Sequence, residues 1–134
     1  MFNRWIEEKL LDDLENMKIG SIVFSPLAQG LLTKRYLNGI PKDSRAKRTT
    51  SPFLTEEAVY EKLDVIKKLN QVATDRNQTL SEMAISWILR NGRITSVLVG
   101  ASSLKQLKAN VKALENLEFT QEELDLIDQI LANE

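Results

Sequence analysis

SIVFSPLAQG at residues 21–30 and TSVLVGASS at residues 95–103 decide the fold of this chain. Each stretch begins with a short apolar run typical of a buried strand and continues into a loop of small residues. The second loop opens directly onto a helix. Strand, small-residue loop and helix start are the parts from which proteins build a cradle for phosphates and dinucleotides. The chain contains two such units, so we expect the cofactor-holding end of a larger barrel.

Helical periodicity fills the intervals around the strands expected at 21–24 and 96–99. Apolar residues recur every three or four positions in five stretches, which begin near residues 3, 55, 79, 103 and 120. The first predicted helix covers about 3–17, and Gly20 is expected to end it in a left-handed conformation. The second covers about 55–76.

Several of these helices carry large apolar residues on one face. Trp5 and Trp87 lie on such faces, and we expect both in the core. The helix that begins at Ser103 is expected to bury three apolar side chains against the rest of the chain: Leu107, Val111 and Leu114.

Composition excludes several classes of function. The net charge of -1 offers no attraction to nucleic acid or to an anionic membrane, and no apolar run approaches the ~20 residues of a membrane helix. The chain has no cysteine, so it has no disulfides or thiolate metal sites, which fits a reducing cytoplasm. It has no histidine either, so Ser-His and Cys-His pairs and imidazole ligands are excluded. We expect no metal site.

The second strand–loop unit has the residues of an anion site. Gly100 permits a close backbone approach, and Ser102 stands beside the free N–H groups of the next helix. Gln106 and Asn110 follow on one face of that helix, where their amides can bind a phosphate or a purine edge. The alternative is that Ser103 and Gln106 simply form a capping box.

The first unit offers a complementary set. Phe24 closes its strand with an aromatic face able to stack on a planar ring, and Lys34 and Arg45 are the nearest downstream cations. Phe24 as a core residue and the two cations as solvated loop charges are the alternatives. The loop after Phe24 contains residues with small side chains, Ser25, Ala28 and Gly30, and a proline, Pro26, which fixes the backbone φ just after the strand.

At these residues the chain resembles the aldo-keto reductases. Segments 24–36 and 40–46 are similar to the stretch after the seventh strand of that family, and segment 100–110 to the stretch after the eighth. Segment 80–91 matches the helix between them. The branch it resembles most holds the voltage-gated potassium channel β subunits and the bacterial L-glyceraldehyde 3-phosphate reductases, and the resemblance covers essentially the whole chain.

The resemblance implies the C-terminal portion of a (β/α)8 barrel, mostly helical with two short parallel strands. Residues 1–134 would be a single incomplete domain with the last two strand–helix units and the C-terminal helix. The full-length parent would reduce small aldehydes or ketones, with glyceraldehyde 3-phosphate-like compounds among the candidates, by hydride transfer from NADPH.

The resemblance also assigns roles toward NADP(H). Phe24 would stack behind the nicotinamide, and Asn110 would meet the adenine, beside Ala109 where the channel branch has a glutamate. Around the adenosine 2′-phosphate would stand Lys34, Arg45, Ser102 and Gln106, with Gly100 at the start of the same segment. The pyrophosphate would be lined by Ser25, Pro26, Leu27, Ala28 and Gly30.

The family's catalytic Asp, Tyr, Lys and His lie on earlier strands, so we expect no catalytic residue here and no activity from the chain alone. The alternatives are a non-catalytic nucleotide-binding or subunit-interaction module, and a helical piece that binds nothing. Two strands cut from a barrel expose unpaired edges and apolar helix faces. We therefore expect self-association, or complementation by the missing part of the barrel.

Overall fold

Two short parallel strands form the only sheet in the part of the chain that the structure describes. The computed structural model describes residues 1–47 and 54–132, except the side chain of Arg45. Strand β1 (Ile22–Phe24) pairs with β2 (Ser96–Leu98), with Ile22 opposite Ser96 and Phe24 opposite Leu98. The two parallel strands predicted from the sequence are confirmed.

Helices make up most of the remaining structure. Short 3-10 turns lie between them, among them η1 (Trp5–Glu7) and η3 (Lys34–Tyr36). The α-helices are α1 (Leu10–Asn16), α2 (Glu56–Glu61), α3 (Leu63–Asp75), α4 (Leu80–Leu89), α5 (Leu104–Lys112) and α6 (Gln121–Ala132).

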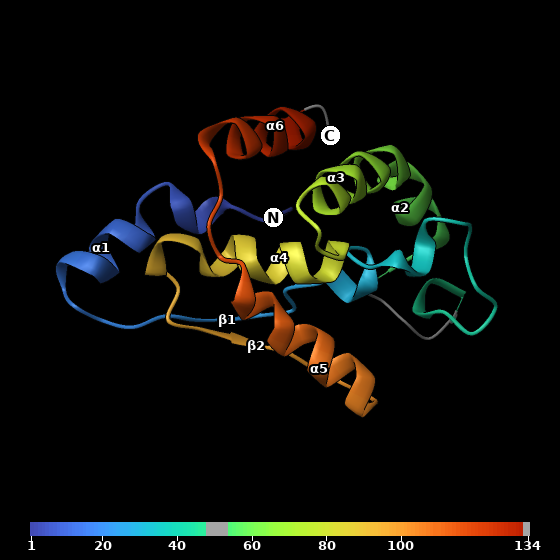
Figure 1. The fold of residues 1–134 in the computed structure, drawn as a ribbon, viewed down its shortest axis with the longest axis horizontal. Helices are drawn as coiled ribbons and strands as arrows, with labels where there is room; N and C mark the ends of the chain where they lie inside the picture. Colours follow the sequence, from blue (N-terminus) through green and yellow to red (C-terminus); the bar gives the residue numbers. More distant parts are fainter. Residues whose placement is uncertain (48–53, 133–134) are drawn as a thin grey trace.

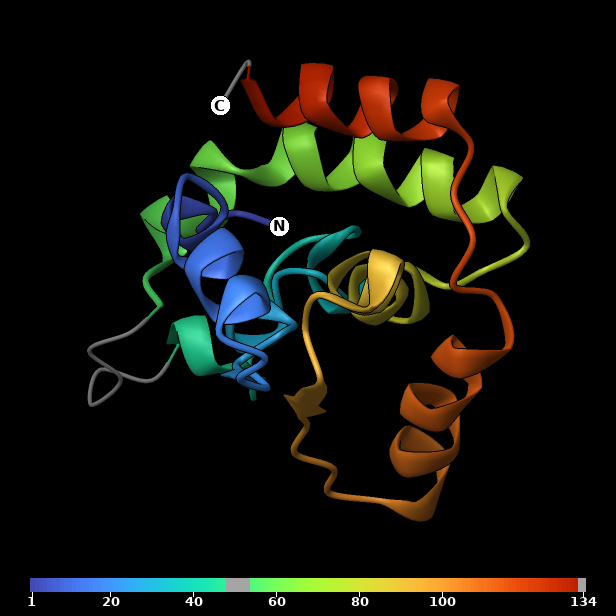
Figure 2. The ribbon, with the colours of Figure 1, turned by 90° about the vertical axis from the view of Figure 1, so that its left-hand side faces the viewer.

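Helix α4 lies in the middle of the molecule, between the sheet and a pair of helices. Figures 1 and 2 show α3 and α6 side by side on one side of α4, with the strands and α5 on the other. The core sits between the three helices, where Ile66, Leu69, Leu80, Met83 and Ile127 are fully buried. Helix α4 begins with a capping box. Thr79 Oγ1 accepts from the backbone N–H of Glu82, and Glu82 Oε2 accepts from the backbone N–H of Thr79.

One buried arginine joins the end of α3 to the segment that leads into α6. Arg76 pairs with Glu123, donates to the carbonyl of Glu118 at 2.7 Å, and lies 3.6 Å over the ring of Phe119. A buried guanidinium needs such partners, because an unpaired charge away from water is costly. The contacts hold α6 against α3.

Two predicted helices are each divided in the structure. The stretch 3–17 forms η1 and α1, and the stretch 55–76 forms α2 and α3, which meet at Lys62. Lys18, with φ 56°, takes the left-handed conformation that we expected at Gly20. Gly20 has another function, because a Cβ there would lie 2.9 Å from Thr95 Oγ1. Because glycine has no Cβ, the backbone at Gly20 can approach Thr95, and the two strands begin close together.

The predicted burial is wrong at several apolar residues. Trp87 is buried as expected, but Trp5, in η1, is 61% exposed because no described element covers its ring. On α5 the face turned toward α4 carries Asn110 and then Ala113, whose carbonyl accepts from Ser86 Oγ at 2.8 Å. The predicted apolar face points away and is exposed at Leu107, Val111 and Leu114.

Candidate cofactor site

The two small-residue loops leave the sheet next to each other. Phe24 and Leu98 are opposite residues at the carboxyl ends of two parallel strands. The segments that follow, 25–30 and 99–103, therefore both start at the carboxyl end of the sheet. In open and closed α/β sheets, ligands bind at this end.

The first loop is wound into an unusual backbone conformation. Ser25, Ala28 and Gln29 have φ of 54°, 46° and 59°, and Gly30 has φ of 100°. Left-handed conformations at residues other than glycine cost about 1–3 kcal/mol each and concentrate at functional sites. Two hydrogen bonds stabilise the turn, from Ala28 N to Ser25 O at 3.0 Å and from Gly30 N to the carbonyl of Leu27 at 2.9 Å.

Where the second loop meets α5, a side-chain carbonyl of the helix accepts hydrogen bonds from the loop. Ser103 Oγ caps α5 by accepting from Gln106 N at 3.2 Å, so the predicted cap is present. The Gln106 side chain does not complete the capping box on Ser103. Its Oε1 instead accepts from Ser102 N at 2.8 Å and from Ser102 Oγ at 3.0 Å. This oxygen occupies the position in which an oxygen of a bound anion would meet the same two donors.

The other predicted residues are spread over both loops. Phe24 is 79% exposed, so its ring face is open for stacking, and Lys34 is exposed on η3. Gly100 is exposed beside Ser102, whereas Asn110 is buried and does not share the exposure of Gln106. The side chain of Arg45 lies outside the described part of the chain.

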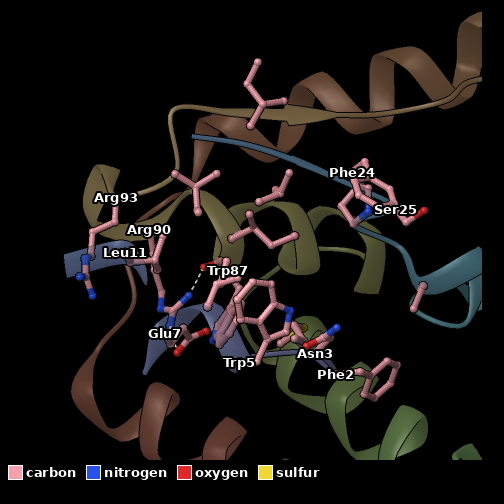
Figure 3. A pocket seen from close by; sticks show the side chains of 18 of the residues that line it. Phe2, Asn3, Trp5, Glu7, Leu11, Phe24, Ser25, Trp87, Arg90 and Arg93 are labelled. Carbon is pink, nitrogen blue, oxygen red and sulfur yellow. Dashed lines mark hydrogen bonds and ion pairs between the residues drawn. The ribbon is translucent and has the colours of Figure 1, made fainter. Parts of the chain in front are cut away.

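A cavity of about 660 Å³ opens beside the first loop (Figure 3). Its walls come from the N-terminal segment, α1, β1 with its loop, and the end of α4. Four predicted residues line it: Phe24, Ser25, Pro26 and Ala28. Ser102 and Gln106 do not, so this cavity does not unite the two loops.

A charged group closes one end of the cavity. Glu7 Oε2 lies 2.7 Å from Arg4 Nη2 and 3.8 Å from Arg90 Nη2. The guanidinium of Arg90 stacks 3.6 Å from the Trp87 ring, and burial lowers the pKa of Arg90. Burial also lowers the pKa of the Met1 amino group to about 6.

Sequence reasoning missed this charged group. The residues belong to a stretch expected to form one continuous helix and to the last turn of another. Nothing in the apolar spacing indicates that Glu7 and Arg90 meet. In Figure 3 they stand apart from Phe24 and Ser25, across the cavity.

Other kinds of site find no support in the described ranges. No helix within 1–47 or 54–132 is long and apolar enough to cross a membrane. Within the same ranges, no three acidic side chains gather in a way that could hold a metal ion.

Comparison with known proteins decides the family. The model of the Aldo/keto reductase family matches residues 1–132. The chain belongs to the aldo/keto reductase family. It is 50% identical over 137 residues to L-glyceraldehyde 3-phosphate reductase of Escherichia coli O157:H7, covering 99% of this chain and 40% of that protein. It is 34% identical to a putative voltage-gated potassium channel subunit beta of Schizosaccharomyces pombe, covering 93% of this chain and 38% of the relative.

Solved aldo-keto reductase barrels share the fold. The glycerol dehydrogenase of Gluconobacter oxydans superposes with a TM-score of 0.78 at 27% identity, over 98% of this chain and 40% of that structure. An aldo-keto reductase of Bacillus halodurans in its holo form gives 0.68 at 26% identity, over 96% and 39%. The predicted fold class, part of a (β/α)8 barrel, is confirmed. The chain spans about 40% of the length of the relatives that it matches.

Proposed function

We propose that this chain is the NADP(H)-holding part of a cytoplasmic aldo-keto reductase, a single incomplete domain of two strand–helix units and a C-terminal helix. One observation carries the proposal: two loops of small residues leave opposite residues, Phe24 and Leu98, at the same edge of a parallel sheet. A dinucleotide is long enough to contact two neighbouring loops at once. The full-length parent would reduce small aldehydes or ketones, of which glyceraldehyde 3-phosphate is the compound suggested by the most similar relatives quoted above.

The nicotinamide half would lie along the first loop. The exposed ring of Phe24 supplies a stacking face. The left-handed residues Ser25 and Ala28, with Gly30, form a tight turn whose small side chains leave room for a pyrophosphate. Pro26 and Leu27 pack beneath this turn, since Pro26 is buried and Leu27 contacts the core.

The adenosine half would lie over the start of α5. The N–H and the hydroxyl of Ser102 both donate to Gln106 Oε1. An oxygen of the 2′-phosphate would accept from the same two donors in place of Gln106 Oε1. Lys34 and Arg45 would add positive charge, Gly100 would admit the backbone approach, and Asn110 would contact the adenine from its buried position on α5. Preference for NADP over NAD follows from these 2′-phosphate contacts.

We propose that the chain alone is inactive. Hydride transfer to a carbonyl needs a proton donor at the carbonyl oxygen. The resemblance places the family's catalytic groups on strands that precede these residues, and the chain contains no histidine. The chain would hold the cofactor while another part of the barrel supplies the proton.

A titration tests the cofactor site. We expect saturable binding of NADPH, measured by calorimetry, and at least about tenfold weaker binding of NADH because of the missing phosphate. Ser102→Ala should weaken NADPH and leave NADH unchanged. The matched control is Ser81→Ala, a serine on another helix remote from both loops in sequence. Equal affinities for the two nucleotides, or no saturation, would contradict the proposal.

Turnover tests the predicted inactivity. NADPH consumption with small aldehydes, including glyceraldehyde 3-phosphate, should not rise above that of a sample without protein. Consumption in a sample free of full-length reductase would show that the chain carries a proton donor that we have not identified.

A subunit-interaction role is the second candidate. The exposed apolar residues of β1, β2 and α5 favour it, because monomeric proteins seldom leave such faces uncovered. The chain would then self-associate or bind the rest of a barrel. Binding of NADPH without turnover, together with stable assembly, would fit this role.

A further inference from the structure

The short turn η3 carries two cations with different surroundings. Arg35 Nη2 lies 2.8 Å from Asp43 Oδ2, so the charge of Arg35 is already paired. Lys34 is exposed, and among the described residues it pairs with no carboxylate. Lys34 is therefore the cation of this turn that is available to a bound anion.

The start of η3 is tied to the first loop through one hydroxyl. Thr33 Oγ1 donates to the carbonyl of Gly30 at 2.7 Å and accepts from Arg35 N at 3.1 Å. Gly30 ends the left-handed part of that loop, with φ of 100°. The backbone of Lys34 lies between the two partners of the hydroxyl, so these bonds fix where Lys34 stands relative to the loop.

The end of η3 is held by one buried ring. Tyr36 is 1% exposed, and a Cβ placed on Gly30 would lie 3.7 Å from Tyr36 Cε2. The ring therefore lies against the side of Gly30 where another residue would carry its side chain, and it belongs to the same hydrophobic core as Leu32. The hydroxyl of Tyr36 has no hydrogen-bond partner among the described residues. Packing of the ring, and not a bond of the hydroxyl, holds this end of the turn.

The turn depends on this packing more than the first loop does. A 3-10 turn of three residues has few internal hydrogen bonds, so it does not fix its own position. The loop before it has backbone bonds of its own, such as those from Gly30 N to Leu27 O at 2.9 Å and from Leu31 N to Ala28 O at 3.1 Å. Loss of the Tyr36 ring should therefore displace Lys34 more than it displaces the loop.

We infer that Tyr36 is a positioning residue, whose buried ring holds η3 against Gly30 and so fixes Lys34 where it meets the 2′-phosphate of NADP(H). The inference rests on the proposed function, to which it adds a residue that sets the preference for NADPH over NADH. Tyr36 touches no cofactor, because its ring is buried. NADH lacks the 2′-phosphate, so its affinity does not depend on Lys34. A merely structural role of Tyr36 would instead lower both affinities alike.

Calorimetric titration of the full 134-residue chain with NADPH and with NADH tests this role. Tyr36→Leu removes the flat ring and should lower the ratio of the two affinities at least about fivefold, with NADH affinity changed less than about twofold. The conservative variant Tyr36→Phe keeps the ring and should restore the ratio of the unsubstituted chain. An unchanged ratio in Tyr36→Leu, or equal losses for both nucleotides, would overturn the inference.

A double-mutant cycle tests whether Tyr36 acts through Lys34. Lys34→Ala should itself lower NADPH affinity at least about fivefold, because it removes the charge that meets the 2′-phosphate. Addition of Tyr36→Leu to this variant should then change NADPH affinity less than about twofold, since no ammonium group is left to position. Losses that add up in the double variant would contradict a role through Lys34.

Amide hydrogen exchange without nucleotide tests the anchor apart from the cofactor site. The amides of Arg35 and Gly39 donate to Thr33 Oγ1 and to the carbonyl of Tyr36, and in Tyr36→Leu they should exchange at least about tenfold faster. The amide of Met83, in the core helix α4, is the control and should change little.

Tyr36→Met is measured in parallel, because its flexible side chain fills more of the same space and spares the core if Tyr36→Leu does not fold. Unchanged exchange at Arg35 and Gly39 in a folded variant would overturn the inference. An unsubstituted chain that does not bind NADPH would contradict the proposed function and with it the role toward Lys34, whereas the exchange rates report on the anchor itself.

Discussion

The helical half and the sheet half of this molecule differ in how completely they cover themselves. In the helical half, α3, α4 and α6 enclose a core in which Leu69 and Ile127 have no exposed surface. In the sheet half, β1, β2 and α5 carry large apolar side chains that face solvent, such as Leu98 and Val111. Helix α4 separates the sheet and α5 from α3 and α6 (Figure 2).

The difference follows from the kind of element in each half. A helix satisfies its own backbone groups and needs only one apolar stripe covered, so three helices can complete a core together. A two-stranded sheet has two free edges and two faces, and it needs further strands for stability. Helices α3, α4 and α6 therefore complete a core together, whereas the two strands lack further neighbours among the described residues and leave apolar side chains uncovered.

The same substitution placed in each half gives the largest contrast. Leu69→Ala should lower the free energy of unfolding by about 2–5 kcal/mol, because it leaves a cavity in the closed core. Leu98→Ala removes a side chain that is already exposed and should cost about 0.5 kcal/mol or less. Urea denaturation of the two variants checks this. A similar cost for both would mean that β2 is buried in solution.

The attachment of α6 gives the second contrast. Arg76→Ala removes the partner of Glu123 and of the Glu118 carbonyl, and should cost about 2–3 kcal/mol. Amide exchange across 121–132 should accelerate as α6 loosens.

The control for Arg76 is an exposed ion pair. Arg35 Nη2 lies 2.8 Å from Asp43 Oδ2 in a solvated loop, and Arg35→Ala should change stability by about 0.5 kcal/mol or less. If both substitutions lower the free energy of unfolding equally, burial of Arg76 adds nothing to the attachment of α6.

Local chemistry made the element starts predictable. Thr55, Thr79, Ser103 and Thr120 were each expected at a helix start, and each accepts a hydrogen bond from a backbone N–H three residues on. Such caps depend on residues three positions apart, so the sequence contains all the information needed. The Ser102–Gln106 contact is similar, because residues four apart on a helix are neighbours.

Burial was not predictable in the same way. Periodicity identifies the apolar face of a helix but not what covers it, and the faces at Trp5 and Val111 have no cover among the described residues. The inference from apolar to buried holds only when the covering elements belong to the same chain. The Glu7–Arg90 contact was missed because it joins residues 83 positions apart through the tertiary fold.

The smallest expected difference is between the exposed and the covered side of α5 and the turn that follows it. Replacing both Leu107 and Val111 by Gln should change the free energy of unfolding by about 0.5 kcal/mol per site or less, because both side chains already face water. The double variant should bind less of the apolar dye ANS and show less light scattering at high concentration. Ala113→Gln, in the turn that continues α5 on its covered side, should cost about 1–3 kcal/mol by overpacking against α4. If the double variant is destabilised as strongly as Ala113→Gln, the exposed stripe is already covered in solution, and the sheet half has found a partner in a second copy of the chain.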